Sequence, residues 1–173
     1  MLMKYSVSIL GLLVCLSLLL PSACLSAEHM IGGGVLYQKT LGDIKDNDEF
    51  DDDAINWIAS YQLASDSPIK LEIDLEIVPD FGGSDMTFYM PQGYLLFGSR
   101  IYVGAGIGYG YLDGEWTNDP FYAFRGGLDL PLGEKVHLDI NANYRFMDFA
   151  VLDDIDSQDA DAITFGAILR FEL

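Results

Sequence analysis

The residues that could carry acid–base or nucleophilic chemistry are few in this 173-residue chain. His137 stands two residues from Asp139, and Asp occupies the place where a histidine base would need a hydroxyl nucleophile. His29 lies beside the expected N-terminus of the mature chain and has no catalytic partner that the sequence identifies, and no glycine loop of the phosphate-binding kind occurs. No cluster of His or Cys has the spacing of metal ligands. We therefore expect no catalytic residue, no cofactor and no structural metal.

Carboxylate side chains could bind Ca²⁺, which takes six to eight oxygen ligands. Residues 46–53 (Asp-Asn-Asp-Glu-Phe-Asp-Asp-Asp) contain six carboxylates. The run lacks the central glycine and the final Glu of an EF-hand loop. We expect a solvated acidic loop. Divalent cations shared with neighbouring phosphates remain a weaker alternative.

The most ordered arrangement of charge lies at residues 69–78, where Lys70, Glu72, Asp74 and Glu76 alternate with Ile and Leu. A period of two is the side-chain period of a β-strand, so the run predicts a strand with one charged and one apolar face. The charged face meets water in a soluble barrel. It lines the interior of a transmembrane barrel, whose apolar face meets lipid.

The elements that would position these residues are all strands. Most ordinary strands have about five or six residues, whereas these have 10–13, close to the roughly 9–11 that a tilted strand needs to cross a bilayer. Pro91 falls inside the fourth run, where it predicts a bulge. The eight runs are 30–40, 54–64, 69–78, 86–97, 100–112, 121–131, 135–147 and 162–173.

The connections between the runs alternate in length and in charge. Segments 65–68, 98–99 and 132–134 are tight, whereas 41–53, 79–85, 113–120 and 148–161 are longer. The longer segments contain 18 of the 27 acidic residues and a single basic residue, Lys45. This division is typical of an up-and-down outer-membrane barrel, with short periplasmic turns and long extracellular loops.

Glycines and aromatic residues favour an apolar exterior. Gly104, Gly106, Gly108 and Gly110 alternate along one strand, and an inward row of glycines would leave space for long polar neighbours in a narrow barrel. Tyr, Trp and Phe gather at the predicted strand ends, as membrane interfaces select. A lipid-facing Lys or Arg near the midplane would cost about 2–4 kcal/mol. The charged face of 69–78 is therefore expected to point inward.

The fold class that follows is all-β, an eight-stranded antiparallel up-and-down transmembrane β-barrel over residues 28–173. We expect the lumen to be closed by a network of ion pairs and amide side chains, whose role is structural. Because these groups are buried, removing one partner of a pair should destabilise the barrel more than removing both. The residues predicted for this network are Lys70, Glu72, Asp74, Glu76, Arg125, Asp129, His137, Asp139, Asn141, Asn143, Arg145 and Arg170.

Residues 1–27 are expected to be a cleaved secretory signal peptide. Lys4 precedes an apolar run over 7–20, and Ala27 offers a small residue at the cleavage position. The run is shorter than the roughly 17–25 residues of a spanning helix. Ser22-Ala23-Cys24 resembles the end of a lipobox, so lipidation at Cys24 stays open.

Cleavage there would remove both cysteines and Lys4, and would leave no disulfide in the exported chain. The formal net charge of −18 would become −19. A charge of this sign excludes nucleic acid as a partner, because phosphates require a basic surface.

These patterns resemble the outer-membrane β-barrel family of outer membrane protein A and outer membrane protein X. Tyr102-Val-Gly-Ala-Gly-Ile-Gly-Tyr-Gly110 is similar to the family's glycine-alternating strand, and 69–76 resembles its acidic strand. Thr164-Phe-Gly-Ala-Ile-Leu-Arg-Phe171 looks like the C-terminal signal of the barrel assembly machinery, although the chain ends in Leu173 where many members have Phe or Trp.

The resemblance implies a Gram-negative outer-membrane protein with a structural or surface-interaction role, without enzymatic activity and monomeric. Its implied partners are outer-membrane lipid, lipopolysaccharide and, during insertion, the assembly machinery. Two alternatives remain open at this point. One is a lipid-modifying barrel similar to lipid A deacylases, which use a His and a Ser two residues apart, and the other is an exported soluble, lipocalin-like binding barrel.

Overall fold

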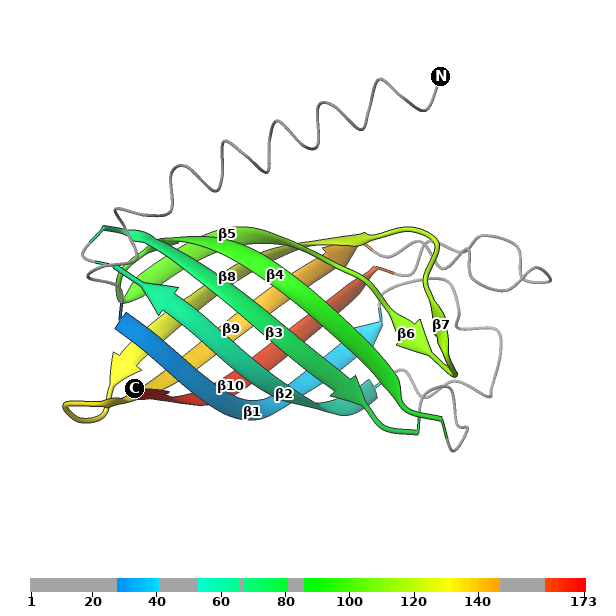
Figure 1. Ribbon diagram of the computed structural model, residues 1–173, viewed down its shortest axis with the longest axis horizontal. Helices are drawn as coiled ribbons and strands as arrows, with labels where there is room; N and C mark the ends of the chain where they lie inside the picture. Colours follow the sequence, from blue (N-terminus) through cyan, green and yellow to red (C-terminus); the bar gives the residue numbers. More distant parts are fainter. Residues whose placement is uncertain (1–27, 41–52, 66, 81–85, 147–160) are drawn as a thin grey trace, which may run out of the picture.

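The computed structural model describes residues 28–40, 53–65, 67–80, 86–146 and 161–173 (Figure 1). The predicted signal peptide, the lipidation site at Cys24 and most of the acidic run 46–53 lie outside these residues. Within the described ranges, no helix has the length and apolar character needed to span a membrane.

Eight long antiparallel strands close into a barrel, so the predicted fold class is confirmed. Each strand pairs with its neighbours along the chain, β3 and β4 pair directly, and β1 pairs with β10 to complete the ring. The strands are β1 (Glu28–Thr40), β2 (Asp53–Ala64), β3 (Ile69–Val78), β4 (Phe88–Gly98), β5 (Ile101–Gly108), β8 (Phe121–Pro131), β9 (Val136–Phe146) and β10 (Ala162–Glu172).

The connections divide between two ends of the barrel. The tight turns 98–99 and 132–134 lie at the end that holds the C-terminus, on the left of Figure 1, and the strand ends that border the longer connections lie at the opposite end, the long-connection end. At that opposite end β6 (Tyr111–Leu112) and β7 (Glu115–Trp116) form a small hairpin that continues from β5. Its two-residue turn places Asp113 and Gly114 at φ values of 48° and 93°, the left-handed backbone that an Asp-Gly turn favours.

Two predictions about this part of the sheet were wrong. The run 100–112 is one strand to Gly108 and a second piece, β6, from Tyr111. Pro91 causes no bulge, because the β3–β4 register runs without interruption through the pair Leu75–Pro91. The interruption lies on the other side of β4, between the end of β5 and the start of β6. There Pro91 has no N–H to donate to the neighbouring strand, although its carbonyl accepts a hydrogen bond from Tyr109 N at 3.1 Å.

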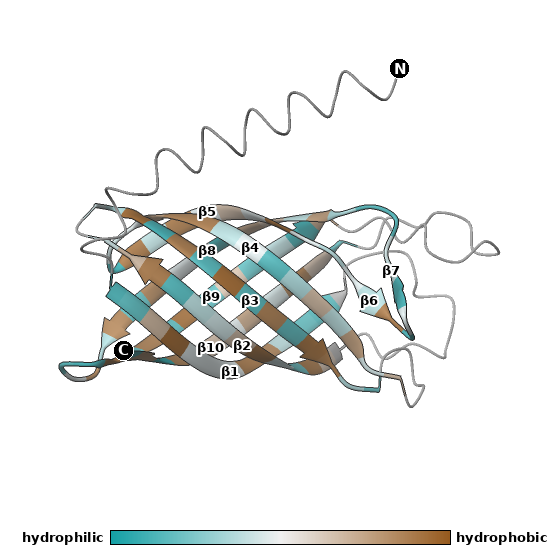
Figure 2. Cartoon of the chain, in the orientation of Figure 1, coloured by the Kyte–Doolittle hydropathy of each residue, from teal (hydrophilic) through white to brown (hydrophobic). Residues whose placement is uncertain are grey.

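The outward face of the barrel is apolar. Brown and teal segments alternate along the strands in Figure 2, as one hydrophobic and one polar face require. The side chains of Ile73, Val103 and Phe124 are 64%, 62% and 60% exposed, although a soluble protein would bury most residues of these types. The prediction that the apolar face of β3 points outward is therefore confirmed.

The interior is less uniformly polar than the sequence suggested. Three apolar clusters are buried inside, one of which consists of Leu36, Ile58 and Ile168. The inward glycines make room for aromatic and aliphatic neighbours, where we had expected long polar ones. A Cβ on Gly106 would lie 2.6 Å from Tyr94 Cε1, and one on Gly104 would lie 2.6 Å from Leu96 Cδ2.

Candidate functional site: the polar interior of the barrel

The twelve residues predicted for the interior network lie on four strands of the barrel, β3, β8, β9 and β10. Successive side chains of a strand point to opposite faces, so these residues, spaced by an even number of positions along each strand, all point inward. Eleven of the twelve are buried, and His137 is half-buried. The structure brings them together in three groups.

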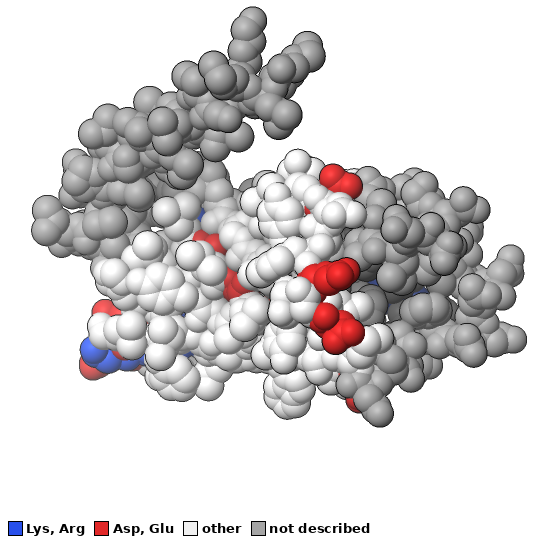
Figure 3. Space-filling view, turned by 45° about the vertical axis from the view of Figure 1, so that its right-hand side comes forward, with Lys and Arg blue, Asp and Glu red and all other residues white. Residues whose placement is uncertain are grey.

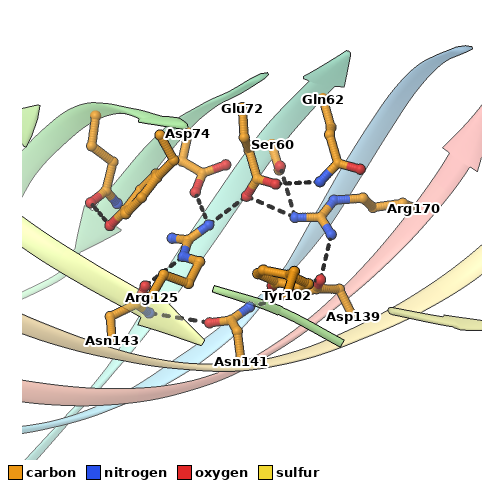
Figure 4. A network of polar contacts seen from close by, with 12 residues as sticks. Ser60, Gln62, Glu72, Asp74, Tyr102, Arg125, Asp139, Asn141, Asn143 and Arg170 are labelled. Carbon is orange, nitrogen blue, oxygen red and sulfur yellow. Dashed lines mark hydrogen bonds and ion pairs between the residues drawn. The ribbon is translucent and has the colours of Figure 1, made fainter. Parts of the chain in front are cut away.

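The central group joins two guanidinium groups to three carboxylates (Figure 4). Arg125 Nη1 contacts Glu72 Oε1 and lies 2.8 Å from Asp74 Oδ2. Arg170 lies 2.8 Å from Glu72 Oε1 through Nη2 and 2.8 Å from Asp139 Oδ2 through Nη1. Glu72 therefore bridges the two arginines.

Arg125 is held from two further sides. Its guanidinium carbon lies 3.7 Å from the centre of the Tyr94 ring, a cation–π contact. Its Nε donates to Asn143 Oδ1 at 2.5 Å, and Asn143 Nδ2 donates in turn to Thr164 Oγ1 at 2.9 Å. These contacts fix the planar guanidinium in one orientation.

Asp139 is also fixed by neutral donors. The Tyr102 hydroxyl donates to Asp139 Oδ2 at 2.7 Å, and Asn141 Nδ2 donates to Oδ1 at 2.6 Å. The phenol reaches this point because Gly127 has no side chain. A Cβ on Gly127 would lie 2.5 Å from Tyr102 Cζ.

The second group pairs Arg145 with Glu76, and neither side chain is exposed. Asn56 Nδ2 donates to Glu76 Oε1 at 2.6 Å, and Gln92 Nε2 donates to Oε2 at 3.2 Å. Asn56 also donates to Gln38 Oε1 at 3.0 Å. The carboxylate thus has one charged partner and two amide donors.

The third group lies toward the tight-turn end. Lys70 Nζ lies 2.7 Å from Asp129 Oδ2 and donates to the Ser99 carbonyl at 3.0 Å. His137 Nδ1 lies 2.8 Å from Asp129 Oδ1. The three side chains line a cavity of about 390 Å³, which Glu28 and Arg100 also border.

Several interior polar residues were missed by the sequence analysis. Ser60 and Gln62 stand on β2, Tyr94 on β4 and Tyr102 on β5, all turned inward with the predicted residues. Gln62 Nε2 donates to Glu72 Oε2 at 2.5 Å. Their signal was present in the alternation of each strand, but the prediction considered mainly charged types and the two asparagines of β9.

The two histidines considered for acid–base chemistry take part in ordinary polar contacts. His137 contacts the carboxylate of Asp129, and His29 Nδ1 lies 2.6 Å from the Tyr61 hydroxyl. Among the residues that the structure describes, no group of three or more His, Cys, Asp or Glu is placed to hold a metal ion.

The exposed ends differ from the interior in that their charges are solvated. Asp113, Glu115 and Asp119 are exposed on and beside the β6–β7 hairpin. Figure 3 shows carboxylates standing out from a described surface that is otherwise largely uncharged. The face of the barrel wall seen in this view therefore presents few charged side chains to its surroundings.

No protein-family model and no curated protein sequence matches the chain. Solved structures do resemble it in fold. Neisserial surface protein A is 12% identical with a TM-score of 0.63, and the match covers 84% of this chain and 97% of that one.

Two further structures match at a TM-score of 0.50. A de novo designed transmembrane β-barrel is 11% identical over 86% of this chain and 97% of its own. Outer membrane protein AlkL, solved by solid-state NMR in DMPC lipid bilayers, is 15% identical over 86% of this chain and 90% of its own. The resemblance to outer-membrane barrels seen in the sequence is confirmed for the fold: this chain is an eight-stranded antiparallel barrel of the outer-membrane type.

Proposed function

We propose that the chain is an integral outer-membrane protein with a structural or surface-interaction role, whose barrel is closed to solutes by its interior network. One observation carries the proposal. Most large apolar side chains of the described strands point outward, while charged side chains are buried in pairs inside the barrel, which is the inverse of a water-soluble barrel.

The outward surface supports a lipid environment. Exposed Ile, Leu, Val and Phe side chains occur on every long strand, whereas soluble monomers rarely expose contiguous apolar patches of more than a few hundred Å². Trp57 and Tyr122, 58% and 57% exposed, stand toward the long-connection end, where a membrane interface would favour aromatic rings. A soluble lipocalin-like barrel would lose stability by exposing this surface to water.

The interior supports a closed barrel. Arg125 and Arg145 have no exposed side-chain surface, and both are ion-paired across the lumen to strand β3. Apolar clusters fill further sections, including Val78, Phe88 and Phe121. A hydrated solute would have to separate buried ion pairs to pass, and separating such a pair is costly.

The membrane and closure parts of the proposal are tested separately. Purified protein should migrate faster on a detergent gel unboiled than boiled, and the expressed protein should be recovered with outer membranes. Recovery in the aqueous periplasmic fraction would end the membrane assignment. Liposomes containing the protein should exclude small sugars that a general porin admits, and swelling as fast as with the porin would refute closure alone.

The acidic loops are proposed to act at the cell surface, where they would share divalent cations with lipopolysaccharide phosphates. This part rests on the sequence of the longer connections. Replacing Asp51, Asp52 and Asp53 together with Asn should abolish a calcium-dependent rise in melting temperature. A rise of the same size in the variant would exclude this segment as the calcium-binding site.

A further inference from the structure

The β6–β7 hairpin presents aromatic rings on the outward side of the barrel. The strand register pairs Tyr111 with Trp116 and also with Tyr89 of β4, so the three side chains share one face. The ring centroids of Tyr111 and Trp116 lie 5.0 Å apart, and those of Tyr89 and Tyr111 lie 6.5 Å apart. Trp116 is 57% exposed. These three residues are called the hairpin aromatic face below.

The opposite face of the hairpin is attached to the barrel. Leu112 packs against the buried apolar cluster that contains Phe88. Gly110 permits this close approach, because a Cβ there would lie 2.6 Å from Phe88 Cε2. Thr117 fixes the base of the hairpin, since its N–H donates to the Gly110 carbonyl at 2.9 Å and its hydroxyl accepts from Gly110 N at 3.0 Å. The hairpin aromatic face therefore has a fixed direction relative to the barrel wall.

The hairpin aromatic face continues the apolar wall. The outward positions run from Ile101 on β5 through Ile107 and Tyr109 to Tyr111 on β6, and none of them is charged. On β1, by contrast, the outward side ends in the exposed Lys39. Figure 1 shows the hairpin standing beyond the ends of the long strands. On this side of the barrel, the uncharged outward surface thus extends past the long strands.

We propose that the hairpin aromatic face lies in the headgroup layer of the lipid leaflet at the long-connection end. This inference rests on the proposed function, because only a barrel in a membrane would bring lipid to this face. Trp and Tyr favour that layer, since each combines an apolar ring with a polar N–H or O–H group. A two-stranded hairpin alone is at best marginally stable in water, and lipid on its second face would stabilise it.

The depth of the hairpin follows from its backbone and its charges. Among the described strands β7 pairs with β6 alone, so the backbone groups on its second edge need water or headgroups as partners. Asp113 in the turn and Glu115, on the side opposite Trp116, are exposed carboxylates that are costly to place in hydrocarbon. The headgroup layer suits the rings on one side and the solvated carboxylates on the other.

The two tryptophans of the chain provide the test and its control. Trp57→Phe leaves Trp116 as the single fluorophore of this kind, and Trp116→Phe leaves Trp57, which is exposed on the wall. Each variant is folded into phosphatidylcholine vesicles that carry a nitroxide quencher either on the headgroup or at the end of the acyl chain. Faster migration on an unboiled detergent gel verifies that each variant has folded.

Trp116 should be quenched more strongly by the headgroup nitroxide than by the chain-end nitroxide. Stronger quenching from the chain end would place the hairpin in hydrocarbon and overturn the proposal. Quenching of Trp57 without quenching of Trp116 would overturn it as well, while leaving the membrane assignment intact, and would assign the hairpin to water or to a protein partner. Quenching of neither tryptophan would refute the membrane assignment together with this inference.

A second readout uses the natural chain in phosphatidylcholine nanodiscs. A headgroup nitroxide should broaden the indole N–H signal of Trp116 in NMR spectra. A water-soluble gadolinium chelate should broaden the amide signal of Gly114, exposed in the turn, more than that indole signal. An indole signal that the chelate broadens and the headgroup nitroxide leaves sharp would show that the ring stands in water, and would refute the proposal without any substitution.

Discussion

Removal of Arg145 tests most directly whether the interior is closed and poorly hydrated. In Arg145→Met, Glu76 would stay buried and would keep only the amide donors of Asn56 and Gln92. Neither member of the Arg145–Glu76 pair has exposed side-chain surface, so solvent cannot take the place of the lost cation. Breaking a buried pair on one side costs about 3–5 kcal/mol, a large part of a typical stability of roughly 5–15 kcal/mol.

The double variant Arg145→Met with Glu76→Gln should recover most of that loss. It removes both charges, and its amide still offers an oxygen to Asn56 Nδ2. Replacement of a whole buried pair by neutral groups is often close to neutral in free energy. We expect the double variant to lie within about 2 kcal/mol of the natural chain, so that the two single losses are strongly non-additive.

Equilibrium urea unfolding in vesicles supplies the assay, followed by tryptophan fluorescence. Trp57 is suited to report it, because its ring is 58% exposed on the outer face and would move from lipid to water. A loss of less than about 1 kcal/mol in Arg145→Met would refute the reasoning. Values in that range belong to exposed pairs, and they would mean that water reaches Glu76.

Two further predictions concern the inward and the outward face of the wall. Gly106→Ala should lower the free energy of unfolding by about 1–3 kcal/mol, because the added Cβ overpacks against the Tyr94 ring. The control Gly93→Ala, whose Cβ would meet only a carbonyl at 3.9 Å, should lower it by less than about 1 kcal/mol. Equal losses in urea unfolding would contradict the packing argument. Ile73→Arg, midway along β3, should lower the free energy of unfolding in vesicles by about 2–4 kcal/mol. Ile69→Arg, at the end of the strand, should lower it by about 0–1 kcal/mol. Equal losses at the two positions would argue against a lipid-facing wall.

Strand positions could be predicted where side chains alternate strictly. Residues 69–78 form β3 with both ends as predicted, because every second residue from Lys70 to Glu76 is charged and a shift by one would reverse both faces. The run 100–112 was predicted less well. Its break after Gly108 is explained by Pro91 on the adjacent strand, and a single run carries no information about its neighbour.

The contents of the interior could be predicted only in part. The direction of each side chain follows from its parity along the strand, which is why the twelve residues named from the sequence face inward. Which of them meet depends on the stagger between distant strands. Arg145 and Glu76, for example, stand 69 residues apart. The inward direction of Tyr102 also follows from its parity, but its contact with Asp139 does not, because that contact passes over Gly127 on a third strand, β8.

The pairing of β1 with β10 has a consequence for the order of events during synthesis. Eleven residue pairs, from Met30–Glu172 to Thr40–Ala162, join the first strand to the last. The barrel therefore cannot close before the residues of β10 have been made, and until then β1 and β9 each leave an edge of unpaired backbone. A stop codon shortly before Ala162 would remove Arg170 and the seam together. Closure thus depends on the last strand, and a product truncated before β10 would be left as an open sheet.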